Sequence, residues 1–251
     1  MTDTDTDNSA ASAPGDRDRE GRPPRVAIDG PAGAGKSTVA KRLADRLGFL
    51  HVDTGALYRT VALAARRAGA AWDDEPRVAL VAEALVSERR IRMERPHGSG
   101  AMRVILDGDE VSGLIRTPEM SAGASRVSAI AAVRRALLDL QRQAGAEGGV
   151  VLEGRDIGTV VFPDAEVKLF LTATPEERAR RRFDELTEKG VATTYEATLQ
   201  DQLARDKADT ERPVAPLRRA DDAVLIDSTG RDVGEVIEEM VRVVQARRTD
   251  R

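Results

Sequence analysis

Residues 30–38, GPAGAGKST, fit the pattern G-x-x-x-x-G-K-[ST], which holds phosphate groups in nucleotide-binding proteins. The small residues let successive backbone N–H groups face a polyphosphate at the start of a helix. In such a loop the ammonium of Lys36 reaches the β- and γ-phosphates, and the hydroxyl of Ser37 ligates Mg²⁺. The pattern therefore predicts a nucleotide-binding loop formed by Gly30, Pro31, Ala32, Gly33, Ala34, Gly35, Lys36, Ser37 and Thr38.

Two further polar segments each follow an apolar run of the kind that forms a buried strand. They are DTGALYR at 53–59 and EGRDIGTVVFPDA at 153–165. Open α/β sheets bind ligands at the carboxyl edge of their strands, so both segments are expected at one site. Either Asp53 or Glu153 could support a Mg²⁺ ion held by Ser37, and the sequence leaves that choice open. The candidate residues are Asp53, Thr54, Arg59, Glu153, Arg155 and Asp156.

Arginine is concentrated in a third polar region. The segment EERARRRFDE at 176–185 places four arginines on one predicted helix. Such a cluster is often only a solvated helix face. A kinase, however, has to neutralise the transferring phosphoryl group and shield it from water, and an arginine-bearing mobile lid does both. The candidate lid residues are Arg178, Arg181 and Arg182, and the next segment adds Arg205, Asp209 and Arg212 on successive helical turns.

The elements that position these residues alternate between apolar runs and helical stripes. This alternation predicts an α/β fold with a mainly parallel sheet covered on both faces. The stretch 88–115 breaks the rhythm and predicts a small antiparallel hairpin unit with a loop at 95–100. Strands are predicted at 25–29, 49–53, 149–153, 165–171 and 223–228, and helices at 39–47, 56–69, 76–87, 117–143, 174–190, 195–211 and 233–248.

Composition excludes several other chemistries. The chain has no cysteine and only two histidines, which rules out thiolate metal sites and cysteine nucleophiles. The formal charge of −4 argues against general nucleic-acid binding. No charge-free run approaches the roughly 18 residues of a membrane span, and no export signal is evident. We therefore expect a cytoplasmic protein without nucleic-acid or membrane partners.

A phosphate-binding loop alone does not define the reaction. A GTPase needs a base-reading N/T-K-x-D motif, but the only asparagine is Asn8, and no Thr-Lys-x-Asp occurs. A mechanochemical ATPase is usually longer and has a strand that ends in paired acids, whereas VVLEG at 150–154 ends in one. A small-molecule kinase fits the length and leaves much of the chain to bind an acceptor.

Five segments in order then carry a resemblance. IDGPAGAGKST, DTGALYR, EGRDIGTVVFPDA, EERARRR and RDKADTERPVAPL together resemble the bacterial cytidylate (CMP) kinases, a family of P-loop nucleoside monophosphate kinases. VILDGDEVSGLIRTPEM at 104–120 also resembles the inserted nucleoside-monophosphate-binding (NMP-binding) domain of that family. The resemblance covers about residues 25–248. It implies transfer of the γ-phosphoryl group of ATP to CMP or dCMP with Mg²⁺, by a monomer.

The resemblance also implies an organisation of the chain. The fold would be a three-layer P-loop fold with a parallel five-stranded core sheet, an inserted NMP-binding domain and a helical lid. Residues 25–85 and 129–251 would form the core, 86–128 the inserted domain and about 176–195 the lid. Residues 1–24 lack large apolar side chains beyond Met1 and are predicted to be a disordered tail.

Residue roles follow from the same resemblance. Arg59 and Arg155 match family positions that grip the acceptor phosphate. Ser125, Arg134 and Asp156 match positions that read cytosine, while Arg205, Asp209 and Arg212 match positions around the acceptor ribose and phosphates. Arg178, Arg181 and Arg182 match the lid. The family often has Ser at Thr54 and Asp at Glu153, so these two positions depart from its pattern.

Two alternatives remain at this stage. The chain could be a kinase for another small acceptor, such as UMP or shikimate. It could also be a nucleotide-binding module that uses the loop without phosphoryl transfer.

Overall fold

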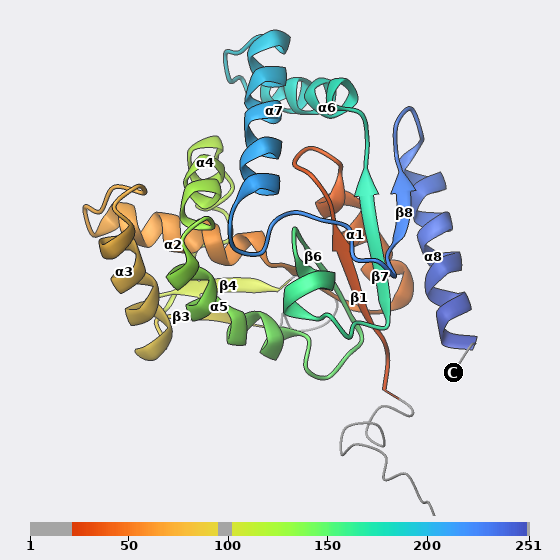
Figure 1. The fold of residues 1–251 in the computed structure, drawn as a ribbon, viewed down its shortest axis with the longest axis horizontal. Coiled ribbons are helices and arrows are strands. Elements are labelled where there is room, and N and C mark those ends of the chain that lie inside the picture. The colour runs from red at the N-terminus through yellow and green to blue at the C-terminus, as the bar shows by residue number, and fades with distance from the viewer. Residues whose placement is uncertain (1–21, 95–101, 250–251) are drawn as a thin grey trace, which may run out of the picture.

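The computed structural model describes residues 22–94 and 102–249 of the chain. Its centre is a five-stranded, fully parallel sheet with the strand order β2-β6-β1-β7-β8. The carboxyl ends of the strands point toward one end of the molecule (Figure 1). The α/β prediction with a five-stranded parallel core is therefore confirmed. The strands are β1 (Arg25–Asp29), β2 (Leu50–Asp53), β6 (Val150–Gly154), β7 (Val167–Thr172) and β8 (Val224–Asp227).

Both faces of this sheet are apolar and covered, because successive residues of a strand pack on opposite faces. Val26 and Ile28 of β1 pack toward α1 (Lys36–Leu47) and α8 (Val233–Thr249). Ala27 between them packs on the other face with the residues around the short helix η1 (Ile157–Val161). The central strand is thus buried along its whole length, and the loop that follows it is held rigidly.

A second apolar cluster lies beside the sheet. Four helices and a small antiparallel sheet of order β3-β4-β5 form it. Residues outside the predicted unit 86–128 also belong to this cluster, because α2, α3 and α5 supply many of its buried side chains. The predicted loop at 95–100 lies outside the described residues. The elements are α2 (Gly55–Arg67), α3 (Glu75–Ser87), β3 (Ile91–Glu94), β4 (Arg103–Leu106), β5 (Asp109–Glu110), α4 (Pro118–Val127) and α5 (Ala131–Ala144).

The prediction of one helix over 117–143 was wrong, because the chain turns between α4 and α5. The Ser128 hydroxyl donates to the carbonyl of Ser125 at 3.0 Å, so the turn has a local alternative to helical bonding. Ile130 then takes an extended conformation, with φ −76° and ψ 116°, and buries its side chain in the second apolar cluster. Long-range burial of Ile130 therefore outweighs the helical periodicity.

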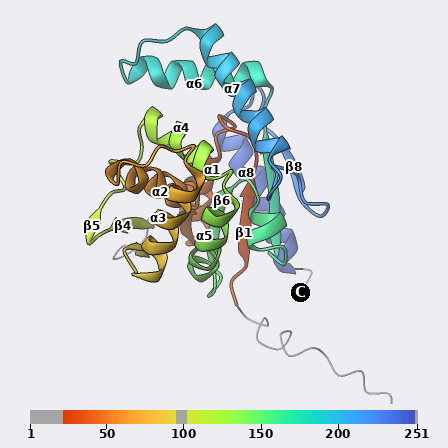
Figure 2. The same cartoon turned by 60° about the vertical axis from the view of Figure 1, so that its left-hand side comes forward.

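Two helices stand beyond the carboxyl ends of the strands. They are α6 (Pro175–Glu188) and α7 (Tyr195–Glu211), and Figures 1 and 2 show α6 crossing the end of α7 above the sheet. Each begins at a threonine, Thr174 or Thr194, whose side chain accepts a hydrogen bond from the backbone of the first turn. The chain thus places its most arginine-rich helix above the phosphate-binding loop.

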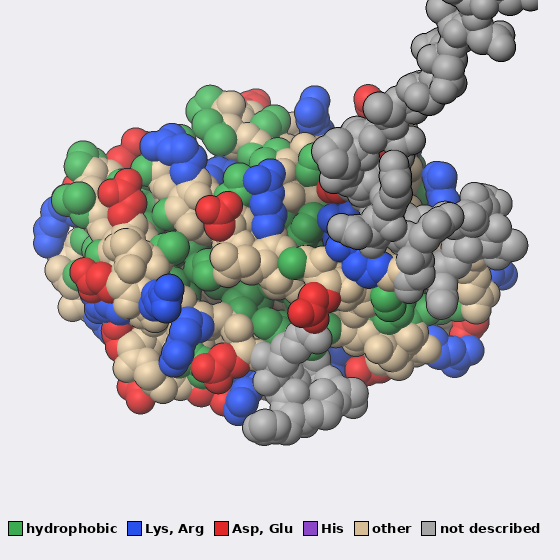
Figure 3. All heavy atoms as spheres, turned by 90° about the horizontal axis from the view of Figure 1, so that it is seen from below, with side chains coloured by type: hydrophobic (Ala, Val, Ile, Leu, Met, Phe, Trp, Pro, Cys, Tyr) green, Lys and Arg blue, Asp and Glu red, His purple; other side chains and the backbone are tan. Residues whose placement is uncertain are grey.

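The opposite end of the molecule has a mixed surface. Figure 3 shows basic and acidic side chains interspersed with apolar ones on the side away from α6. Residues 22–24, the last of the predicted tail, contact the body here, since the Pro23 carbonyl accepts from the Gly149 N–H at 3.1 Å. In the residues that the structure describes, no helix is long and apolar enough to cross a membrane.

The first strand is fixed at this end by an ion pair. The backbone N–H and the guanidinium of Arg25 both donate to the carboxylate of Glu166, at 2.8 and 3.1 Å. Burial alone would raise the pKa of Glu166, but these hydrogen bonds and the positive charge outweigh it. They lower the pKa from its ordinary value of 4.5 to about 2. The ionised form therefore stabilises the fold at neutral pH.

We expect Glu166→Gln to lower the free energy of unfolding at neutral pH by about 1–3 kcal/mol, the range for hydrogen bonds to charged groups. The wild type loses this contribution as the pH falls from about 4.5 to about 2, because its folded pKa lies below its ordinary value. Urea unfolding across that range measures the loss, and the variant should show a shallower decline. Glu238→Gln, which removes an exposed ion pair with Arg46, is the control. Parallel curves for wild type and Glu166→Gln would contradict the assignment.

Candidate active site

The loop between β1 and α1 has the geometry of a phosphate cradle. Gly30 has φ 152°, and a Cβ there would lie 2.0 Å from the Leu171 carbonyl oxygen of β7. Gly33 has φ 73°, and a Cβ there would lie 2.4 Å from the Gln202 side chain of α7. A side chain at Gly30 would collide with the β7 backbone, and Gly33 has a left-handed conformation that other residues rarely adopt, so glycine is favoured at both positions. The backbone of residues 30–35 is thus packed closely against β7 and α7. Gly35, the last residue of this stretch, is the N-cap of α1.

Lys36 is buried at the first position of α1, and its Nζ donates to the Pro31 carbonyl at 2.6 Å. Burial, followed by the nearby charge of Arg155, lowers the pKa of Lys36 well below its ordinary value. The carboxylates of Glu153 and Asp209 oppose this shift. Lys36 therefore sits where an added anion would favour its charged form.

A carboxylate from β6 faces the first turn of α1. The Ser37 hydroxyl donates to Glu153 Oε2 at 2.8 Å. The other oxygen, Oε1, lies 3.0 Å from His51 Nε2 on β2. Asp53 instead pairs with Arg59 at 2.5 Å and accepts the Ala56 N–H at 3.2 Å. Of the two carboxylates left open by the sequence, Glu153 is therefore the one bonded to Ser37.

A second polar group lies beyond the end of β6. The carboxylate of Asp156 bonds to the guanidinium of Arg134 on α5 and lies 3.4 Å from Nη2 of Arg212. Arg134 also stacks over the ring of Tyr58, 5.4 Å from its centroid. All four side chains are buried. Hydrogen-bond donors and an acceptor thus meet where α2, α5 and the segment after α7 converge.

Between these two groups lies an excess of positive charge. Arg155 donates to Asp209 at 2.8 Å, but no carboxylate of the described chain is within ion-pair distance of Arg205. Burial, then the positive charges of Arg155, Arg59 and Arg182, lower the pKa of Arg205 to about 10, while Asp209 opposes them. Four arginines and the buried Lys36 therefore surround a region with too few carboxylates to balance them.

The three expected lid arginines do not behave alike. Arg178 is buried and its guanidinium donates to the carbonyl of Ala32 in the loop at 3.0 Å. It also pairs with Asp206 of α7 at 2.6 Å. Arg181 donates to the Ser228 hydroxyl and carbonyl, at 3.0 and 2.7 Å. The third, Arg182, pairs with Glu185 on its own helix.

Arg178 therefore joins three structural elements at the base of α6. Arg181 links α6 to the turn after β8, and its Nη1 lies 3.9 Å from where a Cβ on Gly35 would be. Arg182 pairs with Glu185, which is on the same helix and partly exposed. Arg181 and Arg182 are less buried than Arg178, so they can change partners more readily than Arg178 can.

The family follows from comparison with known proteins. A family model described as "Cytidylate kinase" matches residues 26–246. The chain belongs to the cytidylate kinase family. A cytidylate kinase of Syntrophotalea carbinolica is 54% identical over 222 residues, which are 88% of this chain and 92% of the relative. One of Geobacter sulfurreducens is also 54% identical over 222 residues, 88% of this chain and 93% of its own.

Among solved structures, a shikimate kinase from Acinetobacter baumannii is similar to this chain, with a TM-score of 0.40 and 16% sequence identity over 89% of this chain and 94% of its own.

The residues present fit a magnesium ion bound mainly by a nucleotide. The described chain has no group of three or more His, Asp or Glu side chains arranged to hold a metal ion. Mg²⁺ suits such a site, because it retains several waters and takes one or two protein oxygens together with substrate phosphates. The Ser37 hydroxyl, which donates to Glu153, is a protein oxygen of the kind that such a site needs.

Two of the predicted site residues, Ser125 and Thr54, take part in hydrogen bonds that support the local backbone. Ser125 is half-buried on α4, and its carbonyl accepts a hydrogen bond from Ser128. The Thr54 hydroxyl donates to the carbonyl of Glu153 at 2.7 Å and so ties the start of α2 to β6. A hydroxyl at position 54 is therefore needed for the local fold, whether serine or threonine supplies it.

Sequence reasoning missed several members of the cluster. Some stand inside the quoted segments and some outside them, but none was assigned a role, because only contacts across the chain show their partners. Asp29, which directly precedes the loop, was the one with a visible signal, since a charge ends an otherwise apolar strand. The missed residues are Asp29, His51, Tyr58, Gln202 and Asp206.

The charge excess predicts opposite effects of one substitution with and without an anion. Arg205→Ala should raise the melting temperature of the free enzyme, because it relieves repulsion with Arg155. It should also reduce the stabilisation given by tripolyphosphate. At a ligand concentration of 100 times Kd, that stabilisation is about 2.7 kcal/mol in the wild type. Thermal unfolding with and without tripolyphosphate measures both effects.

Lys207→Ala, on the exposed face of the same helix, is the matched control and should leave both values unchanged. A lower melting temperature for free Arg205→Ala, together with an undiminished response to tripolyphosphate, would show that Arg205 has only a structural role.

Proposed function

We propose that the chain transfers the γ-phosphoryl group of ATP to CMP or dCMP, with CDP or dCDP and ADP as products. The observation that carries this proposal is the set of cations around Arg205. It lies between the phosphate-binding loop and the buried Asp156 group. Two phosphorylated substrates brought together there supply the negative charge that the free protein lacks. Membership of the cytidylate kinase family points to the same reaction.

The loop side of the site is assigned to ATP. Backbone N–H groups of residues 30–35 surround the phosphates, and Lys36 leaves the Pro31 carbonyl to reach the β- and γ-oxygens. Mg²⁺, when bound, neutralises charge on those oxygens. Ser37 would hold it, and Glu153 is the carboxylate that orients the Ser37 hydroxyl, with His51 fixing the far oxygen of Glu153. Asp53, paired with Arg59, has the different task of fixing that arginine.

The Asp156 group is assigned to the acceptor base. Cytosine presents O2 and N3 as acceptors and an N4 amino group as a donor. Arg134 supplies donors, whereas Asp156 and the Ser125 hydroxyl supply acceptors. Uracil reverses the pattern at positions 3 and 4 and would leave these buried groups unpaired. Arg212 and Asp209 lie on the path from this base toward the cations, where the ribose and phosphate belong.

Catalysis then rests on positioning and charge. Arg59 and Arg155 grip the acceptor phosphate, and the in-line arrangement of the two substrates needs no covalent enzyme intermediate. Closing of α6 exchanges the present partners of Arg181 and Arg182, Ser228 and Glu185, for phosphoryl oxygens. Arg178, which is buried against Ala32, anchors the first turn of α6 to the phosphate-binding loop. Its role is to hold the lid and the loop together.

A direct assay of phosphoryl transfer tests the proposal. Wild-type enzyme with ATP and Mg²⁺ should phosphorylate CMP and dCMP far faster than UMP, AMP or shikimate. Lys36→Ala should lose about two to three orders of magnitude in kcat, in line with removal of a group that stabilises transition-state charge. Nucleoside diphosphate formation is measured by separation of products. A preference for UMP would overturn the cytosine assignment. Undiminished CDP formation by Lys36→Ala would contradict the mechanism, and no transfer by the wild type would favour a binding module.

Arg134→Ala tests the acceptor site alone. The change removes the donors that face the base and leaves the buried Asp156 carboxylate with Arg212 as its neighbouring cation. We therefore expect KM for CMP to rise about 10- to 100-fold. KM for ATP should stay within about twofold, because Arg134 has no contact with the loop. Steady-state titration of each substrate separates the two effects. Arg135→Ala, the exposed neighbour on α5, is the control. Equal losses for both substrates would remove Arg134 from the acceptor site.

A further inference from the structure

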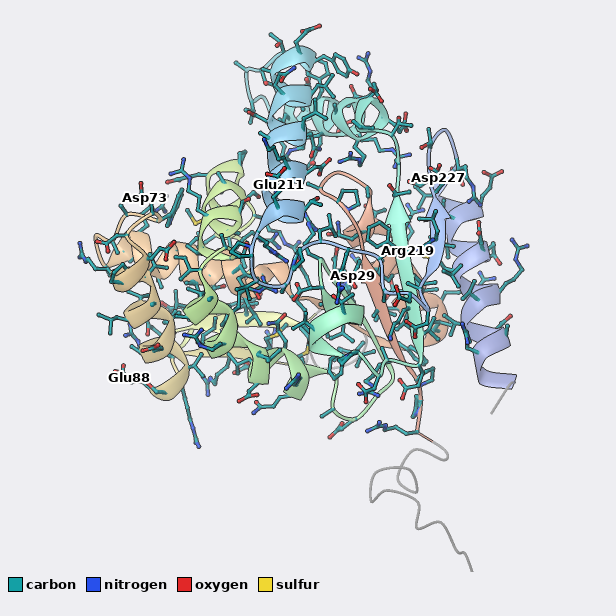
Figure 4. All side chains as sticks on the ribbon, viewed as in Figure 1. Asp29, Asp73, Glu88, Glu211, Arg219 and Asp227 are labelled. Atoms are coloured by element: carbon teal, nitrogen blue, oxygen red, sulfur yellow. The ribbon has the colours of Figure 1, made fainter. Side chains whose placement is uncertain are left out.

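Asp29 ends the central strand and is buried, with 5% of its surface exposed. Its two carboxylate oxygens accept separate hydrogen bonds, one from the N–H of Ile157 and one from the N–H of Gly158, both at 2.8 Å. Figure 4 labels Asp29 near the centre of the molecule, beside the short helix that these two residues begin. The carboxylate therefore bridges from β1 to the segment after β6.

The two amides need an acceptor from elsewhere. They are the first N–H groups of η1, a single π-helical turn, and the first N–H groups of any helix lack partners within it. The carbonyl of the preceding residue, Asp156, is already used by Val160 and Val161, at 2.9 and 3.2 Å. Asp29 thus fixes the turn at its start, where the backbone of Asp156 has the uncommon angles φ −145° and ψ 25°.

What this turn orients is the side chain of Asp156. Its carboxylate meets Arg134 and Arg212, which arrive from α5 and from the segment after α7. A rotation of the turn would move the carboxylate relative to both arginines. We propose that Asp29 is a positioning residue for acceptor recognition, because it holds Asp156 in place through the amides of Ile157 and Gly158. The proposal rests on the assignment of Asp156 to the acceptor base.

A carboxylate is a costly choice for this position. Burial raises the pKa of Asp29 to about 6, although the two backbone N–H groups lower it and the charge of Asp156 raises it further. An apolar residue would avoid this cost but could not accept two hydrogen bonds. Asparagine has the same shape but only one acceptor, so its NH₂ group would face an amide N–H. The need for two acceptors in fixed positions explains why an aspartate stands at position 29 despite the cost of burying it.

A simpler role is also conceivable, because Asp29 precedes Gly30 of the phosphate-binding loop. If Asp29 served that loop, its loss would weaken ATP binding. If it served only to join β1 to η1, its loss would lower stability and leave substrate preference intact. Only the positioning role predicts an effect on the acceptor and on the choice between bases.

Asp29→Asn separates these roles. We expect KM for CMP to rise about tenfold, as for a lost hydrogen bond to a charged group, with KM for ATP within about twofold. The ratio of kcat/KM for CMP over UMP should fall by a similar factor, since misplaced polar groups read the base less well. Asp74→Asn is the control, because Asp74 likewise accepts a backbone N–H, from Arg77, but at the start of α3. A rise in KM for ATP equal to that for CMP, or an unchanged CMP preference, would overturn the proposal.

A double-mutant cycle tests the route of the effect. If Asp29 acts through Asp156, then Asp29→Asn should add little to the loss in CMP affinity already caused by Asp156→Asn. Full additivity of the two losses would contradict the proposal. Wild-type activity separates a failure of the proposed function from a failure of the positioning role of Asp29. If the proposed function is wrong, the wild type will form no CDP, whatever the variants do.

A variant on η1 tests whether the carboxylate itself is needed, rather than any change near the turn. A Cβ on Gly158 would lie 3.4 Å from Asp29 Oδ2, an ordinary van der Waals distance, and 3.2 Å from the flexible side chain of Lys168. Gly158→Ala should therefore fold and keep both hydrogen bonds to Asp29. It should leave KM for CMP and for ATP within about twofold of the wild type. A loss of CMP affinity in Gly158→Ala as large as that in Asp29→Asn would contradict a specific role of the carboxylate.

Discussion

Repulsion among arginines is the constraint on which the arrangement of this molecule depends. Lys36, Arg59, Arg155 and Arg205 lie close enough to influence one another, and burial strengthens their interaction. Such a group is unfavourable in the free protein, so the surrounding fold has to hold it together. The fully buried β1 and the apolar residues packed on its two faces supply that stability. Binding of phosphorylated substrates then relieves the repulsion where phosphoryl transfer needs positive charge.

The carboxylates near the site limit this repulsion without removing it. Asp53 and Asp209 each take one arginine, while Glu153 is occupied by Ser37 and His51. Each of these pairs fixes the direction of a side chain as well as its charge. Arg205, for which the described residues supply no such partner, is left as the cation most available to an anion. The distribution of acids therefore determines which cations are structural and which can bind substrate.

Much of this could be predicted from the sequence where the signal is local. The phosphate-binding loop, the strand before it and the helix after it are contiguous, so the structure of residues 25–47 could be predicted from that stretch of sequence alone. Asp156 could be placed at the sheet edge by its position after a buried strand, whereas Arg134 and Arg212 followed only from the family resemblance. Contacts between distant segments were not predictable in this way. The pairing of Glu153 with His51, the turn at Ser128 and the burial of Arg178 against Ala32 all depend on which elements become neighbours in space.

The central strand β1 explains how the phosphoryl donor and the phosphoryl acceptor can be held in a fixed position relative to each other. The loop that follows β1 forms the phosphate cradle, while the last residue of β1, Asp29, holds the turn that carries Asp156. Both halves of the site are thus attached within a few residues of one rigid, buried element. In-line transfer requires that the two substrates be placed to within about 0.5 Å. A single strand that anchors both sides meets this requirement better than two separately flexible loops. The mobile part of the site can then be confined to α6, which supplies charge and excludes water without defining the register.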